Sequence, residues 1–316
     1  MNKKNASTTG ENILPVIFLM GPTASGKTAL AIELHQQLGC ELISVDSALV
    51  YRGLDIGTAK PDATELEKAP HQLIDICEPD EPYSASKFCI DAKALIDGTI
   101  KRNIIPVLVG GTMLYFKALR DGLADLPTAD LDIREQIREE AAELGWDAMH
   151  NKLAKIDPES AARITKGDSQ RIQRGLEVYR ISGKTLSQFF QEQSITPLPY
   201  PVINIAIAPK QRTNLRQRIT IRFEQMLAKG FVEEVEGLYR TKGYSTELPS
   251  MRSVGYRQVC EYLAGEMDFD TMKEKAITAT CRLAKRQMTW LRKWPDLNWL
   301  ETADPDNYEK TRMLIE

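Results

Sequence analysis

The chain has 316 residues, of which 42% are hydrophobic and 27% are charged, and its formal net charge at pH 7 is −3. This length and composition exclude a disordered chain and allow a full hydrophobic core together with a second module. The apolar run at residues 13–20 is too short to span a bilayer, and no signal-peptide pattern precedes it. We therefore expect a cytoplasmic protein with no membrane association.

The first predicted unit is a strand, a loop and a helix. Ile13–Met20 is apolar and partly β-branched, and Ala29–Leu38 has helical composition and ends before a glycine. The loop is a full Walker A pattern (a P-loop), made of Gly21, Pro22, Thr23, Ala24, Ser25, Gly26, Lys27 and Thr28. Its backbone N–H groups bind phosphate oxygens, the lysine adds a positive charge, and the Thr28 hydroxyl can ligate a metal. The motif predicts phosphate binding with Mg²⁺ as cofactor, and it does not specify a nucleotide.

The second predicted strand, Leu42–Val45, ends at Asp46. In a doubly wound sheet this position lies beside the P-loop, where functional groups gather. The carboxylate fits a Mg²⁺ ligand, a general base for a nucleophile that approaches the phosphates, or an N-cap formed with Ser47. Position favours a functional role over the cap, and the residue alone does not decide between the first two.

A third strand, Ile104–Val109, is followed by Gly110, Gly111 and Thr112. A nucleotide hydrolase often places a metal-binding aspartate at the end of such a strand, and here small residues follow instead. They leave space for a substrate, and the Thr112 hydroxyl can donate to a leaving oxygen. A tight turn between strand and helix is an equally good interpretation.

The order of elements predicts an α/β fold, with a P-loop doubly wound parallel sheet as core and an inserted all-helical domain. After Asp121 the sequence becomes charged and helix-rich, and the strand-like segment Val202–Ala208 then indicates a return to the sheet. We therefore assign residues 1–121 and 202–316 to the core and residues 122–201 to the insertion. Within the insertion, helices are predicted at Leu131–Leu144, Trp146–Lys155, Pro158–Ile164 and Ser169–Ser182.

Two later helices carry organised cations. In Thr213–Lys229, Arg218 and Arg222 lie four residues apart beside an apolar stripe. In Thr271–Trp294, basic residues recur at helical spacing, and the stretch from residue 275 to 293 contains no carboxylate. A local basic face on a mildly acidic protein is the predicted arrangement.

Seven segments, in this order, make the chain similar to the bacterial tRNA dimethylallyltransferases, also called tRNA isopentenyltransferases. They are GPTASGKT at 21–28, DSALVY at 46–51, DIGTAKP at 55–61, GGTMLYF at 110–116, QRIQR at 170–174, RSVGYR at 252–257 and KRQMTWLR at 285–292. The resemblance extends over essentially the whole chain, and the joint occurrence of these segments is highly specific. Leu49 stands where many family members carry glutamine, so no amide contact to a base is implied there.

The resemblance implies transfer of a dimethylallyl group from dimethylallyl diphosphate to the exocyclic amine of the adenosine 3′ of the anticodon. The P-loop, Lys27 and Mg²⁺ then stabilise the departing diphosphate, Thr112 assists at its bridging oxygen, and Asp46 accepts a hydrogen from the amine. Arg222, which matches an arginine of the family, adds a further cation.

The resemblance also implies contacts with the tRNA anticodon stem-loop, whose target base must leave its stack. The matching residues near the second strand are Asp46, Ser47, Ala48 and Leu49. Those in the insertion are Gln170, Arg171, Ile172, Gln173 and Arg174. Those near the end of the chain are Arg252, Ser253, Val254, Gly255, Tyr256 and Arg257, followed by Lys285, Arg286, Gln287, Met288, Thr289, Trp290, Leu291 and Arg292.

Two other classes of function remain open. A small-molecule kinase or nucleotide hydrolase would bind ATP at the same P-loop, but the missing carboxylate after Val109 and the basic terminal helix count against it. A non-enzymatic RNA-binding module would use the cations and leave the P-loop without a purpose. An insertion that can close on RNA leads us to expect a monomer.

Overall fold

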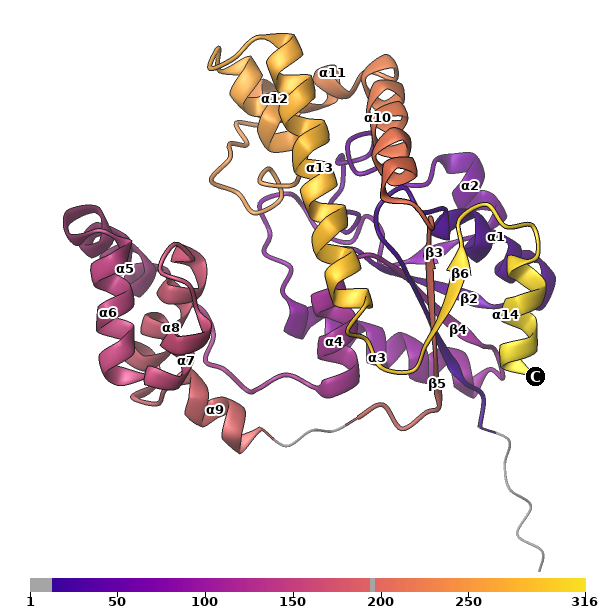
Figure 1. Cartoon of the computed structure of the whole chain (residues 1–316), viewed down its shortest axis with the longest axis horizontal. Helices are drawn as coiled ribbons and strands as arrows, with labels where there is room; N and C mark the ends of the chain where they lie inside the picture. Colours follow the sequence, from indigo (N-terminus) through magenta and orange to yellow (C-terminus); the bar gives the residue numbers. More distant parts are fainter. Residues whose placement is uncertain (1–12, 194–196) are drawn as a thin grey trace, which may run out of the picture. The chain divides into compact units, whose positions relative to one another are not determined.

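The protein is described here by a computed structural model that covers residues 13–193 and 197–316 (Figure 1). Residues 1–12, in which we expect no signal peptide, lie outside the described residues. Residues 194–196 of the predicted insertion also lie outside them. The chain divides into two compact units. The first unit contains the described residues up to Arg120 together with Leu198–Glu316, and the second is Asp121–Pro197.

The first unit is built on a six-stranded, fully parallel sheet with the strand order β3-β2-β4-β1-β5-β6. Its strands are β1 (Val16–Met20), β2 (Glu41–Val45), β3 (His71–Gln72), β4 (Pro106–Gly110), β5 (Val202–Ala208) and β6 (Leu297–Glu301). Every residue of β1 and β4 is buried, as expected of parallel strands that helices cover on both faces. The predicted α/β class and P-loop sheet core are confirmed.

Helices cover both faces of the sheet (Figure 1). Alternate residues of β1 face opposite cores: Ile17 and Leu19 pack with Leu34 of α1, whereas Phe18 packs with Phe88 of α3. The helices and the π-helical turn η1 of this unit are α1 (Lys27–Leu38), α2 (Ala63–Lys68), α3 (Ala85–Lys101), α4 (Met113–Asp121), α10 (Arg212–Ala228), α11 (Phe231–Glu236), η1 (Gly237–Thr241), α12 (Tyr256–Leu263), α13 (Phe269–Leu291) and α14 (Asn307–Ile315).

The second unit is all-helical in its described part and has a core of its own, which includes Ile137, Met149 and Leu153. Its helices are α5 (Leu131–Leu144), α6 (Trp146–Ile156), α7 (Pro158–Arg163), α8 (Ser169–Ser182) and α9 (Leu186–Glu192). The prediction of an inserted all-helical domain is confirmed. In neither unit does a described helix combine the length and apolar composition needed to cross a bilayer.

The sheet topology brings three loops together. Strands β2, β4 and β1 are neighbours and run parallel, so their carboxyl ends lie along one edge. The P-loop follows β1, Asp46 follows β2, and Gly111 follows β4. This edge of the sheet therefore holds the residues with which the candidate site is built.

Candidate functional site

The P-loop connects β1 to α1 with a backbone shaped for anion binding. Ala24 and Gly26 both have positive φ angles, 62° and 96°. Gly26 is also the N-cap of α1, so the first N–H groups of that helix have no partner within it. Free N–H groups at a helix N-terminus form a site for phosphate oxygens.

Lys27 folds back over the loop. Its Nζ donates to the carbonyl oxygens of Gly21 at 2.9 Å and Pro22 at 2.8 Å. Burial, and then the positive charge of Arg222, lower the pKa of Lys27 from 10.5 to about 7, while Asp46 opposes this shift. The site therefore concentrates positive charge that a bound anion would stabilise.

The lowered pKa makes a prediction about stability. Between pH 7 and 10.5 the unfolded chain holds a proton at Lys27 that the folded protein has lost, so this group makes stability rise with pH. Relative to a Lys27→Met variant, the wild type will gain free energy of unfolding above pH 7, by up to about 1.4 kcal/mol per pH unit. Urea unfolding of both proteins from pH 6.5 to 9, without ligand, measures this. A difference that does not change with pH would contradict it.

Asp46 and Thr112 lie in two hydrogen-bonded turns. Oδ1 of Asp46 accepts the backbone N–H of Ala48 at 2.8 Å and of Leu49 at 3.3 Å. The Thr112 hydroxyl oxygen accepts the N–H of Ser47 at 3.1 Å, so its hydrogen remains available to another acceptor. No helix begins directly after Asp46 in the described residues, so the alternative of a helix N-cap formed with Ser47 is wrong. The carboxylate instead closes a turn with the N–H groups of Ala48 and Leu49, and this occupies one of its oxygens.

Helix α10 lies over the P-loop and supplies two arginines. Nη1 of Arg222 donates to the Thr23 hydroxyl at 3.3 Å, and Nη2 donates to the Thr58 carbonyl at 3.2 Å. Nε of Arg218 donates to the Ala24 carbonyl at 2.8 Å. The structure thus brings Arg222 to the P-loop from a distant part of the sequence, as the resemblance implies.

Gln287 lies inside the molecule, not on its surface. Its side chain is 8% exposed and accepts the Thr23 N–H at 3.0 Å, while its Nε2 donates to the Gly111 carbonyl at 2.9 Å. The sequence suggests a tRNA contact for this residue, and the structure places its amide between the P-loop and the loop after β4.

A carboxylate that the sequence did not single out organises the loop at residues 55–60. Glu234 of α11 accepts the N–H groups of Asp55, Ile56 and Gly57 at 3.1, 2.7 and 3.2 Å. It also accepts the hydroxyl of Tyr256. This loop supplies the Thr58 carbonyl to Arg222, so Glu234 holds one of the arginine's two partners in place.

Replacing Glu234 by alanine will leave these donors without an acceptor. Tyr256 is fully buried, whereas the three N–H groups belong to exposed or half-buried residues and can bind water instead. An unsatisfied buried donor costs about 1–3 kcal/mol, so we expect the free energy of unfolding to fall by about that amount. Glu233→Ala is the matched control because Glu233 is the exposed neighbour on the same helix. Equal urea midpoints for the two variants would show that the network does not stabilise the fold.

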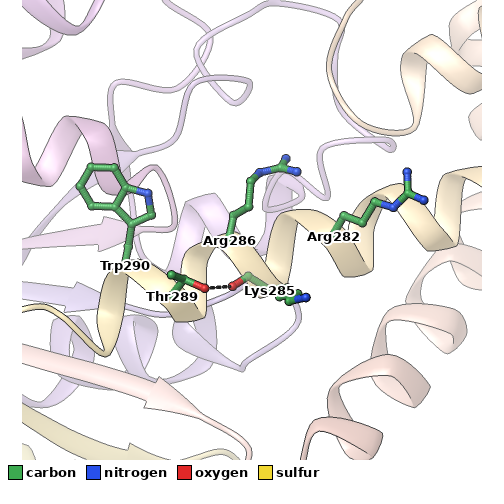
Figure 2. Close-up of a pocket in the computed structure, with 5 residues that line it drawn as sticks. All are labelled: Arg282, Lys285, Arg286, Thr289 and Trp290. Carbon is green, nitrogen blue, oxygen red and sulfur yellow. Dashed lines mark hydrogen bonds between the residues drawn. The ribbon is translucent and has the colours of Figure 1, made fainter. Parts of the chain in front are cut away.

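The outer side of α13 carries the exposed members of the last predicted segment. Figure 2 shows Arg282, Arg286 and Trp290 on one side of this helix, and with Lys285 and Thr289 they line a pocket of about 390 Å³. Arg292 is exposed, Met288 is half-buried, and Leu291 is 1% exposed. Leu291 therefore serves packing, and the cations and Trp290 are the groups that a ligand can reach.

The segment at residues 252–257 is divided in the same way. Arg252 is exposed and donates to the Thr246 carbonyl, and Arg257 is exposed and pairs with Glu261 at 3.5 Å. Ser253 and Val254 are half-buried, Gly255 is buried, and Tyr256 is fully buried. The Tyr256 side chain cannot reach RNA here, so the predicted contact is corrected to a role in the Glu234 network.

In the second unit the predicted residues lie on α8. Gln170 and Arg171 are exposed, whereas Ile172 is fully buried, which corrects its predicted contact to packing. Gln173 donates to the Arg134 carbonyl. Arg174 donates to the Pro127 carbonyl and forms an ion pair with the fully buried Glu177. Gln173 and Arg174 therefore stabilise this unit.

The residues at the P-loop fit a Mg²⁺ ion that is held largely by its ligand. The Thr28 side chain is exposed at the start of α1, and Asp46 keeps an oxygen, Oδ2, outside the turn that it caps. The described residues contain no cluster of three acidic, histidine or cysteine side chains that could hold a metal. Mg²⁺ typically takes one or two protein ligands together with substrate phosphates, and this is the donor set available here.

Comparison with known proteins gives consistent matches. The family model "IPP transferase" matches residues 49–294, and the model "isopentenyl transferase" matches residues 14–76. The chain is similar to the full-length tRNA isopentenylpyrophosphate transferase of Bacillus halodurans, at 34% identity and a TM-score of 0.68. That match covers 95% of this chain and 94% of the other.

Two further solved structures agree. The tRNA delta(2)-isopentenylpyrophosphate transferase of Staphylococcus epidermidis is 33% identical, with 95% of this chain and 97% of that chain covered and a TM-score of 0.67. A eukaryotic dimethylallyltransferase that acts on tRNA is 27% identical, with 95% and 78% covered and a TM-score of 0.79. The likeness therefore extends over nearly the whole chain.

Proposed function

Because the chain belongs to the IPP transferase family, we propose that it transfers the dimethylallyl group of dimethylallyl diphosphate to tRNA. The acceptor is the exocyclic N6 amine of the adenosine immediately 3′ of the anticodon, and the products are N6-dimethylallyladenosine and diphosphate. The observation that carries the proposal is the meeting of a P-loop, a carboxylate and an arginine at one edge of the sheet.

The chemistry assigns each group a role. The amine nitrogen bonds to the first carbon of the allylic group while the bond from that carbon to the diphosphate oxygen breaks. Negative charge grows on the departing diphosphate, where the P-loop N–H groups, Lys27 and Arg222 stabilise it. The free hydrogen of the Thr112 hydroxyl is available to the leaving oxygen.

Asp46 acts as general base in this proposal. Its Oδ2 takes the hydrogen that the amine loses, while its Oδ1 stays bonded to the Ala48 and Leu49 N–H groups. A carboxylate fixed by its own turn is pre-organised for this step, because it does not need to reorient when the substrate binds.

Mg²⁺, held by Thr28 and the diphosphate oxygens, would add positive charge to the leaving group. Lys27 also adds positive charge next to the leaving group. Its pKa of about 7 in the free protein means that a bound diphosphate, by favouring the charged form, draws a proton onto Nζ. Diphosphate affinity will therefore fall as the pH rises above 7.

The tRNA is bound by exposed cations. Arg282, Lys285 and Arg286 on α13 form a basic face next to Trp290, a residue that is 38% exposed and whose indole can stack on an extruded base. Gln170 and Arg171 of α8 offer polar contacts from the second unit. We further propose a monomeric cytoplasmic enzyme, which sedimentation with and without tRNA tests.

Purified protein incubated with unmodified tRNA and radiolabelled dimethylallyl diphosphate tests the proposal. We expect label to enter tRNA with Mg²⁺ and not with EDTA, and we expect no ATP turnover in a parallel reaction. ATP turnover without labelled tRNA would instead favour a kinase or nucleotide hydrolase.

A further inference from the structure

The buried position of Gln287 points to a function different from the RNA contact that its sequence context suggests. We propose that Gln287 is a positioning residue for the diphosphate: it fixes the P-loop to the loop after β4 from the same helix that carries the basic face. This inference rests on the proposed function. It assigns Gln287 to the diphosphate site and not to the tRNA site.

The geometry uses both ends of the amide. Oε1 accepts the Thr23 N–H at 3.0 Å and Nε2 donates to the Gly111 carbonyl at 2.9 Å, so one side chain bridges two loops that are far apart in sequence. Only a side chain with a donor and an acceptor in this arrangement satisfies both groups. An ionised glutamate could not donate, and a methionine has no donor and only a weakly accepting sulfur.

The loop after β4 is built around this amide. A Cβ atom at Gly111 would lie 2.4 Å from Nε2 of Gln287, and a Cβ atom at Gly110 would lie 2.0 Å from the Val45 carbonyl oxygen. Neither glycine can therefore accept a larger residue without displacing its neighbour. Gly111 allows the buried glutamine to approach the backbone closely, and Gly110 allows β4 to approach β2.

Through Thr23, the Gln287 amide also helps to position Lys27 and Arg222. The bond to the Thr23 N–H fixes the backbone of the residue whose hydroxyl accepts from Arg222. The carbonyls of the two preceding residues, Gly21 and Pro22, accept from Lys27. Loss of the Gln287 contact would therefore loosen the segment that orients both cations.

Two adjacent residues of α13, Arg286 and Gln287, serve different substrates in this proposal. Arg286 precedes Gln287 directly and lies on the exposed side with Arg282 and Trp290 (Figure 2), whereas Gln287 points into the core. Substitutions at these two positions should therefore separate the two binding steps, although the residues are adjacent in sequence.

The test compares Gln287→Met, Gln287→Glu and Arg286→Ala with the wild type. Thr280→Ala is the control, because its hydroxyl bonds only to the Ala276 carbonyl of the same helix among the described residues. Calorimetry measures the affinity for inorganic pyrophosphate with Mg²⁺, and steady-state transfer gives the KM for dimethylallyl diphosphate and for tRNA. Thermal melting verifies that each variant is folded.

We expect Gln287→Met to weaken pyrophosphate binding about tenfold, the equivalent of one or two ordinary hydrogen bonds. The KM for dimethylallyl diphosphate rises similarly, and the KM for tRNA stays within about twofold. Arg286→Ala gives the reverse pattern, because it removes a cation from the basic face. Gln287→Glu keeps the shape and can still accept the Thr23 N–H, but it cannot donate to Gly111 and it adds a negative charge beside the P-loop. We expect it too to weaken pyrophosphate binding, and it serves alone if the methionine variant does not fold.

Unchanged pyrophosphate affinity in a folded Gln287 variant would overturn the inference. A raised KM for tRNA alone would assign the residue to direct RNA contact, and a lowered melting temperature alone would assign it to packing. A wild-type protein that binds pyrophosphate but transfers no prenyl group would refute the proposed function, and the binding measurements would still decide the role of Gln287.

Discussion

Replacing Asp46 by asparagine will lower the rate of prenyl transfer by about 10²–10⁴-fold, the range expected when a general base is lost. Asparagine keeps an oxygen that can accept the N–H groups of Ala48 and Leu49, so the turn after β2 is preserved. It cannot take a proton from the amine. Single-turnover measurement with saturating tRNA and dimethylallyl diphosphate therefore isolates the chemical step.

A second variant separates the chemistry from the turn. Asp46→Ala removes the base and the cap together, so it should lose as much activity as Asp46→Asn and, in addition, about 1 kcal/mol of stability. If Asp46→Asn instead transferred the prenyl group at the wild-type rate, the carboxylate would only hold the turn after β2.

Replacing Arg222 by alanine will lower kcat/KM for dimethylallyl diphosphate by about 10²–10³-fold, because the variant loses a cation where negative charge develops. Arg222→Lys keeps the charge but not the planar fork. One ammonium group cannot reproduce the bonds that Nη1 and Nη2 make to Thr23 and Thr58, so we expect an intermediate loss of about tenfold.

Arg216→Ala is the matched control for these variants. Arg216 lies on the same helix, α10, and its side chain is exposed. Removing it changes the net charge by the same amount without removing a contact to the P-loop. An Arg222→Ala enzyme as active as Arg216→Ala would exclude Arg222 from the diphosphate site.

The parallel-sheet core could be predicted because its strands are short, apolar and followed by recognisable loops. The Walker A pattern identified β1 and α1, and Val202–Ala208 was predicted with the bounds that β5 has. Helix starts were less accurate where the cap lies outside the apolar pattern. Asp268 caps α13, which begins at Phe269, whereas the helix was predicted to begin at Thr271.

The elements at the end of the chain could not be predicted from periodicity. Strand β6 is only five residues long and contains an exposed tryptophan, Trp299, so it shows neither an apolar run nor a clear alternation. It pairs with β5 because the sheet offers an open edge, and this is a property of the folded core. Helix α14 then covers α1 on the same side of the sheet.

In the candidate site, the sequence indicated residue types but not the direction of each side chain. Within KRQMTWLR, every polar residue is a reasonable RNA contact on a sequence basis, yet Gln287 points inward and the adjacent Arg286 outward. A shift of about 100° per residue around a helix explains the difference, and only the packing of α13 sets which residue faces the core. Glu234 had no signal at all, because its partners are backbone N–H groups of a distant loop.

The central claim is that this chain prenylates one adenosine of tRNA with the P-loop as diphosphate site. Two anticodon stem-loops test it most directly, one with adenosine and one with guanosine immediately 3′ of the anticodon, each incubated with the protein, Mg²⁺ and labelled dimethylallyl diphosphate. After nuclease digestion and mass spectrometry, we predict N6-dimethylallyladenosine from the first RNA and no product from the second. Label in both RNAs, or in neither while the protein folds and binds pyrophosphate, would contradict the account.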